Sequence, residues 1–182
     1  RHEKRFTDPT FYTSLTKKGL ENSILLIENI HKIQPDIIIS SPFLRCIQTI
    51  YPYSKKYNKK INIEYALYEF LENPLFTEKN YKHTHIELCK TYPKYKDIIN
   101  EKYETKVNFN HITYPEHTFD QLNKRLLTFI DYLRSLYSNT NTKILIVSHM
   151  SIVSSIKYYL QTGQKPTKDY FFPMGHLEKV TL

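Results

Sequence analysis

The chain has 182 residues, of which 40% are hydrophobic and 24% charged, which is enough for one soluble domain with a full core. Its two cysteines lie far apart in the sequence, which excludes a disulfide framework and a metal site built on paired cysteines. So few cysteines favour a reducing compartment, which we expect to be the cytoplasm. The net charge of +8 attracts anions, but charge alone does not choose between phosphate esters, nucleic acid and acidic membranes. The longest aliphatic runs, 24–27 and 144–147, are too short to span a bilayer.

The first elements in chain order are a basic pentapeptide, a loop over 6–15 and a helix over about 16–34. Residues 1–5 read Arg-His-Glu-Lys-Arg. A histidine between arginines can be held neutral and nucleophilic at neutral pH, although a frayed basic terminus would read the same. Thr16 is a helix cap, Pro35 ends the helix, and apolar residues recur between them at helical spacing: Leu20, Ile24, Ile27 and Ile30.

The next stretch, 37–49, predicts a buried strand followed by a helix that reaches about Tyr57. The run 37–39 is three isoleucines, typical of a strand covered on both faces. Ser41 is the expected helix cap and Pro42 suits the first helical position. Arg45 then lies one turn into the helix, beside the free N–H groups of its start, so the stretch is a candidate anion site.

A strand over 59–64 precedes a poorly patterned insertion over about 73–116. We expect a short helix over 83–91 and a loop over 107–115 within it. Such a long insertion between regular elements more often caps a site than serves as a plain connection. The two histidines of Lys82-His83-Thr84-His85 have no acid or cysteine pair at ligand spacing, so no metal site is predicted.

The last third of the chain predicts an amphipathic helix over 119–136 and a fully apolar strand over 143–147. A helix over about 152–160 and a closing strand over 171–182 follow. The alternation of helices and strands predicts an α/β fold: a single three-layer α/β/α domain over 1–182 with a mostly parallel central sheet.

Three polar residues follow the carboxyl ends of predicted strands. Arg45 and His149 each come soon after one, and Glu69 lies a few residues past a third. Ligands of open α/β sheets bind outside these strand ends, so we expect the three side chains to share one rim of the sheet. A histidine in this place could also be a simple helix cap.

The chain resembles the histidine phosphatase superfamily, also called phosphoglycerate mutase-like. Residues 1–5 are similar to its Arg-His-Gly-x-Arg motif, and 40–49 match its Ser-Ser-Pro-x-x-Arg-x-x-Gln-Thr motif over the whole length. Glu69 stands where the family has its proton donor, and 148–150 resemble its Ser-His-Gly. Residues 15–19 are similar to the start of a family helix, so the resemblance covers essentially the whole chain.

The resemblance implies a metal-independent mechanism without a cofactor. His2 would attack phosphorus and become phosphohistidine, and Glu69 would protonate the leaving oxygen. Four groups would grip the phosphoryl oxygens, namely those of Arg1, Arg5, Arg45 and His149. Glu72 and Glu116 are fallback acids.

Some features depart from the family pattern. Glu3 and Met150 stand where the family has glycines. The family's first strand is expected upstream of residue 1. The sequence of residues 67–71 and 114–116 is most similar to the branch that contains the T-cell signalling suppressor phosphatases.

The leading hypothesis is a histidine acid phosphatase-like phosphomonoesterase acting on a phosphorylated small molecule or a phosphoprotein. Alternatives are a phosphoglycerate-type mutase and a catalytically inactive scaffold that binds phosphorylated partners. No membrane partner is expected, and a homodimer is left open. Nucleic acid binding is disfavoured, although 16 tyrosines stand among many lysines, because RNP-like, KH-type, zinc-finger and Walker motifs are missing.

Overall fold

The computed structural model describes residues 12–71, 84–168 and 175–182. Its helices, 3-10 turns and strands are α1 (Lys17–Ile33), β1 (Ile37–Ser40), α2 (Leu44–Tyr57), β2 (Asn62–Ile63), η2 (Tyr65–Leu67), α4 (His85–Thr91), η3 (Pro93–Ile98), η4 (Phe109–His111), α5 (Phe119–Tyr137), β3 (Ile144–Val147) and α6 (Met150–Thr162).

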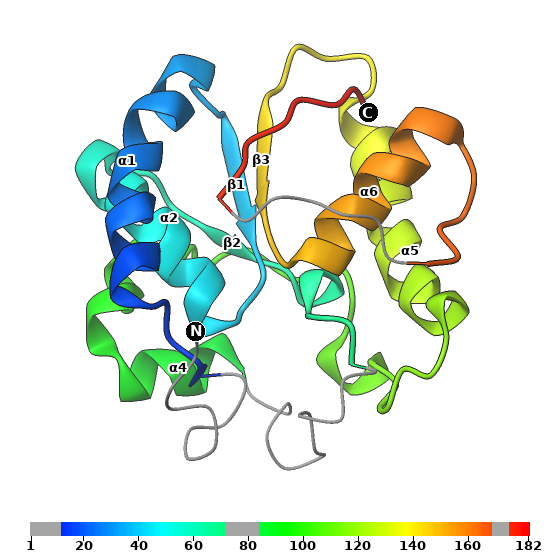
Figure 1. The fold of residues 1–182 in the computed structure, drawn as a ribbon, viewed down its shortest axis with the longest axis horizontal. Coiled ribbons are helices and arrows are strands. Elements are labelled where there is room, and N and C mark those ends of the chain that lie inside the picture. The colour runs from blue at the N-terminus through cyan, green and yellow to red at the C-terminus, as the bar shows by residue number, and fades with distance from the viewer. Residues whose placement is uncertain (1–11, 72–83, 169–174) are drawn as a thin grey trace.

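Three parallel strands form the sheet in the order β2-β1-β3. In Figure 1, α1 and α2 lie on one side of the sheet and α5 and α6 on the other. The three-layer α/β fold predicted from the sequence is confirmed. In the described ranges, no helix is long and apolar enough to cross a membrane.

The register brings the carboxyl ends of β1 and β3 side by side, with Ser40 opposite Val147. Ser41 donates its backbone N–H to the carbonyl of Val147 (2.9 Å), which extends the pairing one residue beyond β1. The residues that follow β1 and β3 therefore start from the same edge of the sheet.

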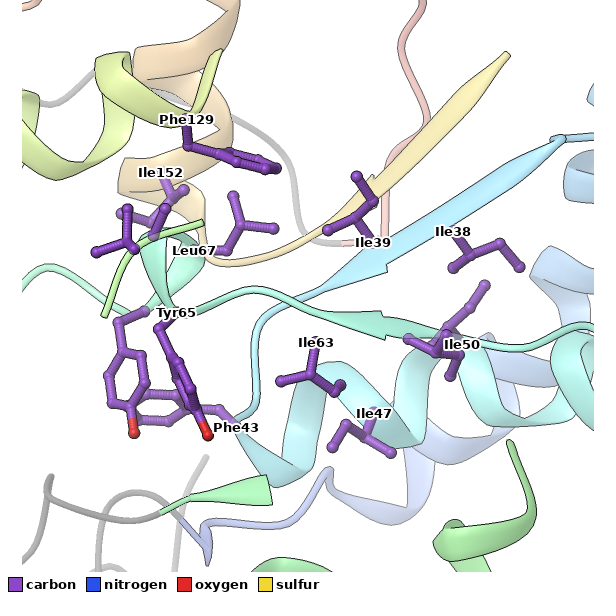
Figure 2. Packing of buried hydrophobic residues seen from close by; sticks show 14 of the residues in the cluster. Ile38, Ile39, Phe43, Ile47, Ile50, Ile63, Tyr65, Leu67, Phe129 and Ile152 are labelled. Atoms are coloured by element: carbon purple, nitrogen blue, oxygen red, sulfur yellow. The ribbon is translucent and has the colours of Figure 1, made fainter. Parts of the chain in front are cut away.

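The core fills both faces of the sheet, because successive strand residues point to opposite sides. Figure 2 shows Ile39 pointing toward the layer of Phe129 and Ile152, while Ile38 lies beside Ile50 of α2. These five side chains are at most 3% exposed. The isoleucine run of β1 is buried on both faces, as predicted.

Helix α1 begins and ends where the sequence predicted. The Thr16 hydroxyl accepts a hydrogen bond from the Gly19 N–H (3.1 Å), which satisfies one of the free donors of the first turn. Gln34 follows the helix in the left-handed conformation (φ 53°) and donates its N–H to the Ile30 carbonyl.

Helix α2 begins at Leu44, so the predicted start at Pro42, with Ser41 as cap, is wrong. Phe43 holds the cap position with an extended backbone (φ −64°, ψ 137°) and no side-chain cap bond. This backbone directs the Phe43 ring into the core, where it is 0% exposed. The Ser41 hydroxyl still accepts the Phe43 N–H at 3.4 Å, but its shorter bond goes to a histidine ring described below.

The predicted closing strand over 171–182 is also wrong for the residues that the structure describes. Residues 175–182 form no strand, and 171–174 lie outside the described residues. Leu177 and Leu182 pack against the core, and Glu178 pairs with Lys157 of α6 at 2.6 Å. Side-chain contacts with a helix hold this segment, so its apolar spacing does not reflect a ladder of backbone hydrogen bonds.

The described part of the insertion, 84–116, is built from short helical turns. The predicted short helix is α4, and its start is a capping box of Thr84 and Glu87. The predicted loop over 107–115 contains the turn η4. Ile99 pairs with Ile61 beside β2, which ties the insertion to the sheet. That the insertion caps the site stays a prediction.

Candidate active site

Three of the predicted site residues lie together at the carboxyl ends of β1 and β3. Arg45 stands in the first turn of α2, Glu69 follows the η2 turn, and His149 comes between β3 and α6. The Glu69 Oε2 atom lies 3.2 Å from Arg45 Nη2 and 3.1 Å from His149 Nδ1. One carboxylate oxygen therefore contacts both the Arg45 guanidinium and the His149 imidazole, which come from separate elements.

The His149 ring is fixed from several sides. Its Nε2 lies 2.9 Å from Ser41 Oγ, so both ring nitrogens have a hydrogen-bonding partner. Cys46 Sγ lies 3.7 Å from Nε2, and the Phe43 ring meets the imidazole edge to face at 4.9 Å between centroids. With 2% of its side chain exposed, His149 is held in a single orientation.

Arg45 is more accessible than His149, because 23% of its side chain is exposed. Its guanidinium carbon lies 4.7 Å from the centroid of the Phe43 ring, a cation–π contact that fixes the plane of the group. The Phe43 ring thus contacts both Arg45 and His149.

Glu69 is held in the ionised form. Burial by itself would raise the pKa of Glu69, but the charge and hydrogen bond of His149, the charge of Arg45 and the Phe70 N–H (3.1 Å) lower that pKa to about 2. The free protein therefore carries a carboxylate here at neutral pH.

The pKa of His149 shifts in the opposite direction. Burial lowers the pKa of the imidazole, but the neighbouring Cys46 sulfur and the Glu69 carboxylate raise it more, and Arg45 opposes them. The result is a pKa above the ordinary value of 6.5.

These contacts predict how His149 titrates. In an NMR titration of the imidazole, we expect a midpoint above the ordinary ~6.5. Glu69→Gln should lower the midpoint because it removes a negative charge, and Arg45→Gln should raise it because it removes a positive one. A midpoint that neither variant moves would show that the three groups are not coupled.

The other predicted substrate and nucleophile residues lie outside the described residues. These are Arg1, His2 and Arg5, together with Glu3 and the fallback acid Glu72. Met150, at the first position of α6, is 43% exposed. A methionine at this family glycine position is accommodated at the surface.

The fallback acid Glu116 does not face this cluster. Its carboxylate is 0% exposed and forms an ion pair with Arg125 of α5, with Oε1 2.6 Å from Nε. A buried carboxylate already paired in this way is not available to protonate a bound substrate.

Sequence reasoning missed three residues around the cluster, namely Ser41 as a partner of His149, Cys46 beside it, and Arg125. The first two belong to the stretch 40–49: Ser41 directly follows β1 and Cys46 lies in the first turn of α2. Across the described ranges, no group of three or more His, Cys, Asp or Glu side chains could hold a metal ion.

A family model for the histidine phosphatase superfamily (branch 1) matches residues 2–180. The chain belongs to branch 1 of the histidine phosphatase superfamily. The resemblance stated from the motifs is thereby confirmed at the level of the superfamily. No curated protein shows significant sequence similarity to the chain.

Solved structures of several phosphatases share the fold of this chain. Mycobacterial glucosyl-3-phosphoglycerate phosphatase is 14% identical, with a TM-score of 0.55, 84% of this chain and 71% of that chain covered. Ecdysone phosphate phosphatase from Bombix mori, solved with tungstate, is 20% identical, with a TM-score of 0.56. The match covers 93% of this chain and 66% of that chain. Alpha-ribazole phosphatase from Shigella flexneri is 20% identical, with a TM-score of 0.53, and the match covers 84% of this chain and 70% of that chain.

Proposed function

We propose that this histidine phosphatase is a metal-independent phosphomonoesterase that works through a phosphohistidine on His2. The observation that carries the proposal is the position of Glu69 between Arg45 and His149 at the carboxyl edge of the sheet. A guanidinium and an imidazole, both able to donate hydrogen bonds to phosphoryl oxygens, stand there beside one carboxyl group suited to proton transfer. Phosphoryl transfer depends mainly on such positioning and charge stabilisation.

The reaction has two steps. In the first, a nitrogen of His2 forms a bond to phosphorus, the bond from phosphorus to the ester oxygen breaks, and Glu69 gives that oxygen a proton. In the second, Glu69 takes a proton from water, whose oxygen attacks the phosphohistidine and releases inorganic phosphate and free His2. Arg45 stabilises the charge on the phosphoryl oxygens in both steps, with Arg1 and Arg5 as the proposed further ligands.

The low pKa of Glu69 in the free protein requires that substrate binding changes its protonation. A dianionic phosphate draws the Arg45 guanidinium toward itself and adds negative charge beside the carboxylate. Both effects raise the pKa of Glu69 above its resting value of about 2. The carboxyl group thus gains its proton when the phosphate arrives and is ready to donate it to the leaving oxygen.

The substrate we favour is a phosphorylated small molecule, because the phosphatases of similar fold act on small phosphate esters according to their names. A phosphoprotein is the alternative substrate. The sequence of residues 67–71 and 114–116 favours the T-cell signalling suppressor branch of the superfamily. The two cysteines are free, in keeping with the proposed reducing, cytoplasmic location.

An assay of aryl phosphate hydrolysis tests the proposal. Activity should persist in excess chelator, and Arg45→Gln should lower kcat/KM by about 10²–10³-fold, the usual cost of one donor to a developing oxyanion. Lys55→Gln is the matched control, because it removes an exposed cation of α2 whose ion pair with Asp97 is long (3.8 Å). Loss of activity in chelator, or equal effects of the two variants, would contradict the proposal.

A further inference from the structure

The segment that carries Glu69 is held by one buried arginine of α5. Arg125 has five N–H donors, and each has an acceptor. Its Nε and one N–H of Nη2 bond to Glu116 at 2.6 and 2.8 Å. The other three bond to backbone carbonyls: Nη1 to Ala66 (2.6 Å) and Tyr68 (3.0 Å), and Nη2 to Glu69 itself (2.9 Å).

Glu116 completes the attachment on the other side of Glu69. Its Oε2 accepts the backbone N–H of Leu71 at 3.0 Å, in addition to its bond from Arg125. The pair therefore fixes backbone groups on both sides of Glu69 as well as the carbonyl of Glu69. The Glu69 side chain is left to face Arg45 and His149.

The pair is costly to bury, which argues for a specific role. Its side chains are 4% and 0% exposed, and desolvating two charges often costs as much as their attraction returns. An apolar pair of equal volume could fill the same space but could not hold three carbonyls and an N–H at fixed positions. What the ion pair adds is the geometry of the segment 66–71.

We propose that Arg125 and Glu116 are positioning residues for Glu69: they hold the proton-transferring carboxyl group at the distance and angle that the leaving oxygen requires. The inference rests on the proposed function and deepens it. Both side chains are buried and bond to each other and to the segment 66–71, so the pair acts on proton transfer through Glu69 and not on phosphate binding.

Arg125→Lys is the sharpest test, because it keeps the positive charge and removes the planar guanidinium group with its five N–H donors. Lysine offers three donors on one nitrogen and cannot reproduce the paired bonds to Glu116 together with three carbonyl contacts. A shift of the carboxyl group by about 1 Å can cost about 10²-fold in rate. The loss should depend on how much protonation the leaving group needs.

The experiment compares an alkyl phosphate, whose leaving oxygen is strongly basic, with p-nitrophenyl phosphate, whose leaving group departs without help. Arg125→Lys should lower kcat/KM, which reports the step in which the ester oxygen leaves, at least about tenfold more for the alkyl ester than for the nitrophenyl ester. Glu69→Gln is measured in parallel. It should also lose more activity on the alkyl ester than on the nitrophenyl ester, and the difference should be larger than for Arg125→Lys. Glu116→Gln removes the paired charge and carries the same test if Arg125→Lys does not fold.

Asn123→Ala is the matched control for a merely structural effect. Asn123 is buried on the same helix and donates to the Pro166 carbonyl at 2.8 Å, away from the Glu69 segment. This variant should lower the melting temperature without selectivity between the two esters. Equal losses on both esters in Arg125→Lys and Glu116→Gln would overturn the positioning role. Absence of selectivity in Glu69→Gln would overturn the proposed function of Glu69 first, and the inference with it.

Discussion

Glu69→Gln should slow the hydrolysis of an alkyl phosphate by about 10²–10⁴-fold, the usual contribution of a positioned acid–base group. The amide cannot give a proton to the leaving oxygen or take one from water. The same change removes the carboxylate that pairs with Arg45 at 3.2 Å and with His149 at 3.1 Å. The Glu69 carboxylate then no longer competes with the phosphate for Arg45, so inorganic phosphate should bind the variant at least as tightly as the wild type.

Steady-state kinetics and product inhibition by inorganic phosphate measure both effects. The combination of a lower kcat with an unchanged or lower phosphate inhibition constant is what separates an acid–base role from a role in binding. Glu101→Gln, an exposed carboxylate paired only loosely with Lys96 (3.9 Å), is the control and should change neither value. Weaker phosphate binding together with unchanged kcat in Glu69→Gln would contradict the proposed role.

His2→Ala should lower phosphate release by more than about 10³-fold on every ester, because removal of a nucleophile blocks the covalent route itself. Unlike Glu69→Gln, this loss should not depend on the leaving group. Phosphate binding should persist through Arg45 and His149. His117→Ala, which removes an exposed histidine just after the insertion, should leave turnover unchanged. Turnover that survives His2→Ala would exclude His2 as the nucleophile.

The sequence was most informative where a residue type and its local spacing determine the structure. The isoleucine run of β1 and the capped helix α1 follow from burial and periodicity, and they were predicted. The parallel sheet was predicted as well, but the register of β1 with β3 was not. The meeting of Arg45, Glu69 and His149 was predicted from one rule, that the carboxyl ends of parallel strands share an edge.

The prediction failed where tertiary contacts override local preference. Ser41 has the chemistry of a helix cap, but His149 lies 2.9 Å from its hydroxyl and the helix starts later. Leu177 and Leu182 have the spacing of a strand, but they pack as side chains without a ladder.

The role of Arg125 could not be predicted because its partners are backbone carbonyls 56 to 59 residues away. One local signal was present: Arg125 stands three residues from Leu122 and four from Phe129, on the buried face of an amphipathic helix. A charged residue in such a place needs a specific set of partners. The pattern indicates that partners exist, but only the fold shows that they belong to the Glu69 segment.

A phosphoryl group should pass through His2 during each turnover. Rapid acid-free quenching of the protein with a radiolabelled aryl phosphate, followed by digestion, measures this directly. We expect one label per chain, stable in base and lost in acid, on the peptide that contains His2, and no label in His2→Ala. A label on another residue, or full turnover without a labelled protein, would contradict the claim.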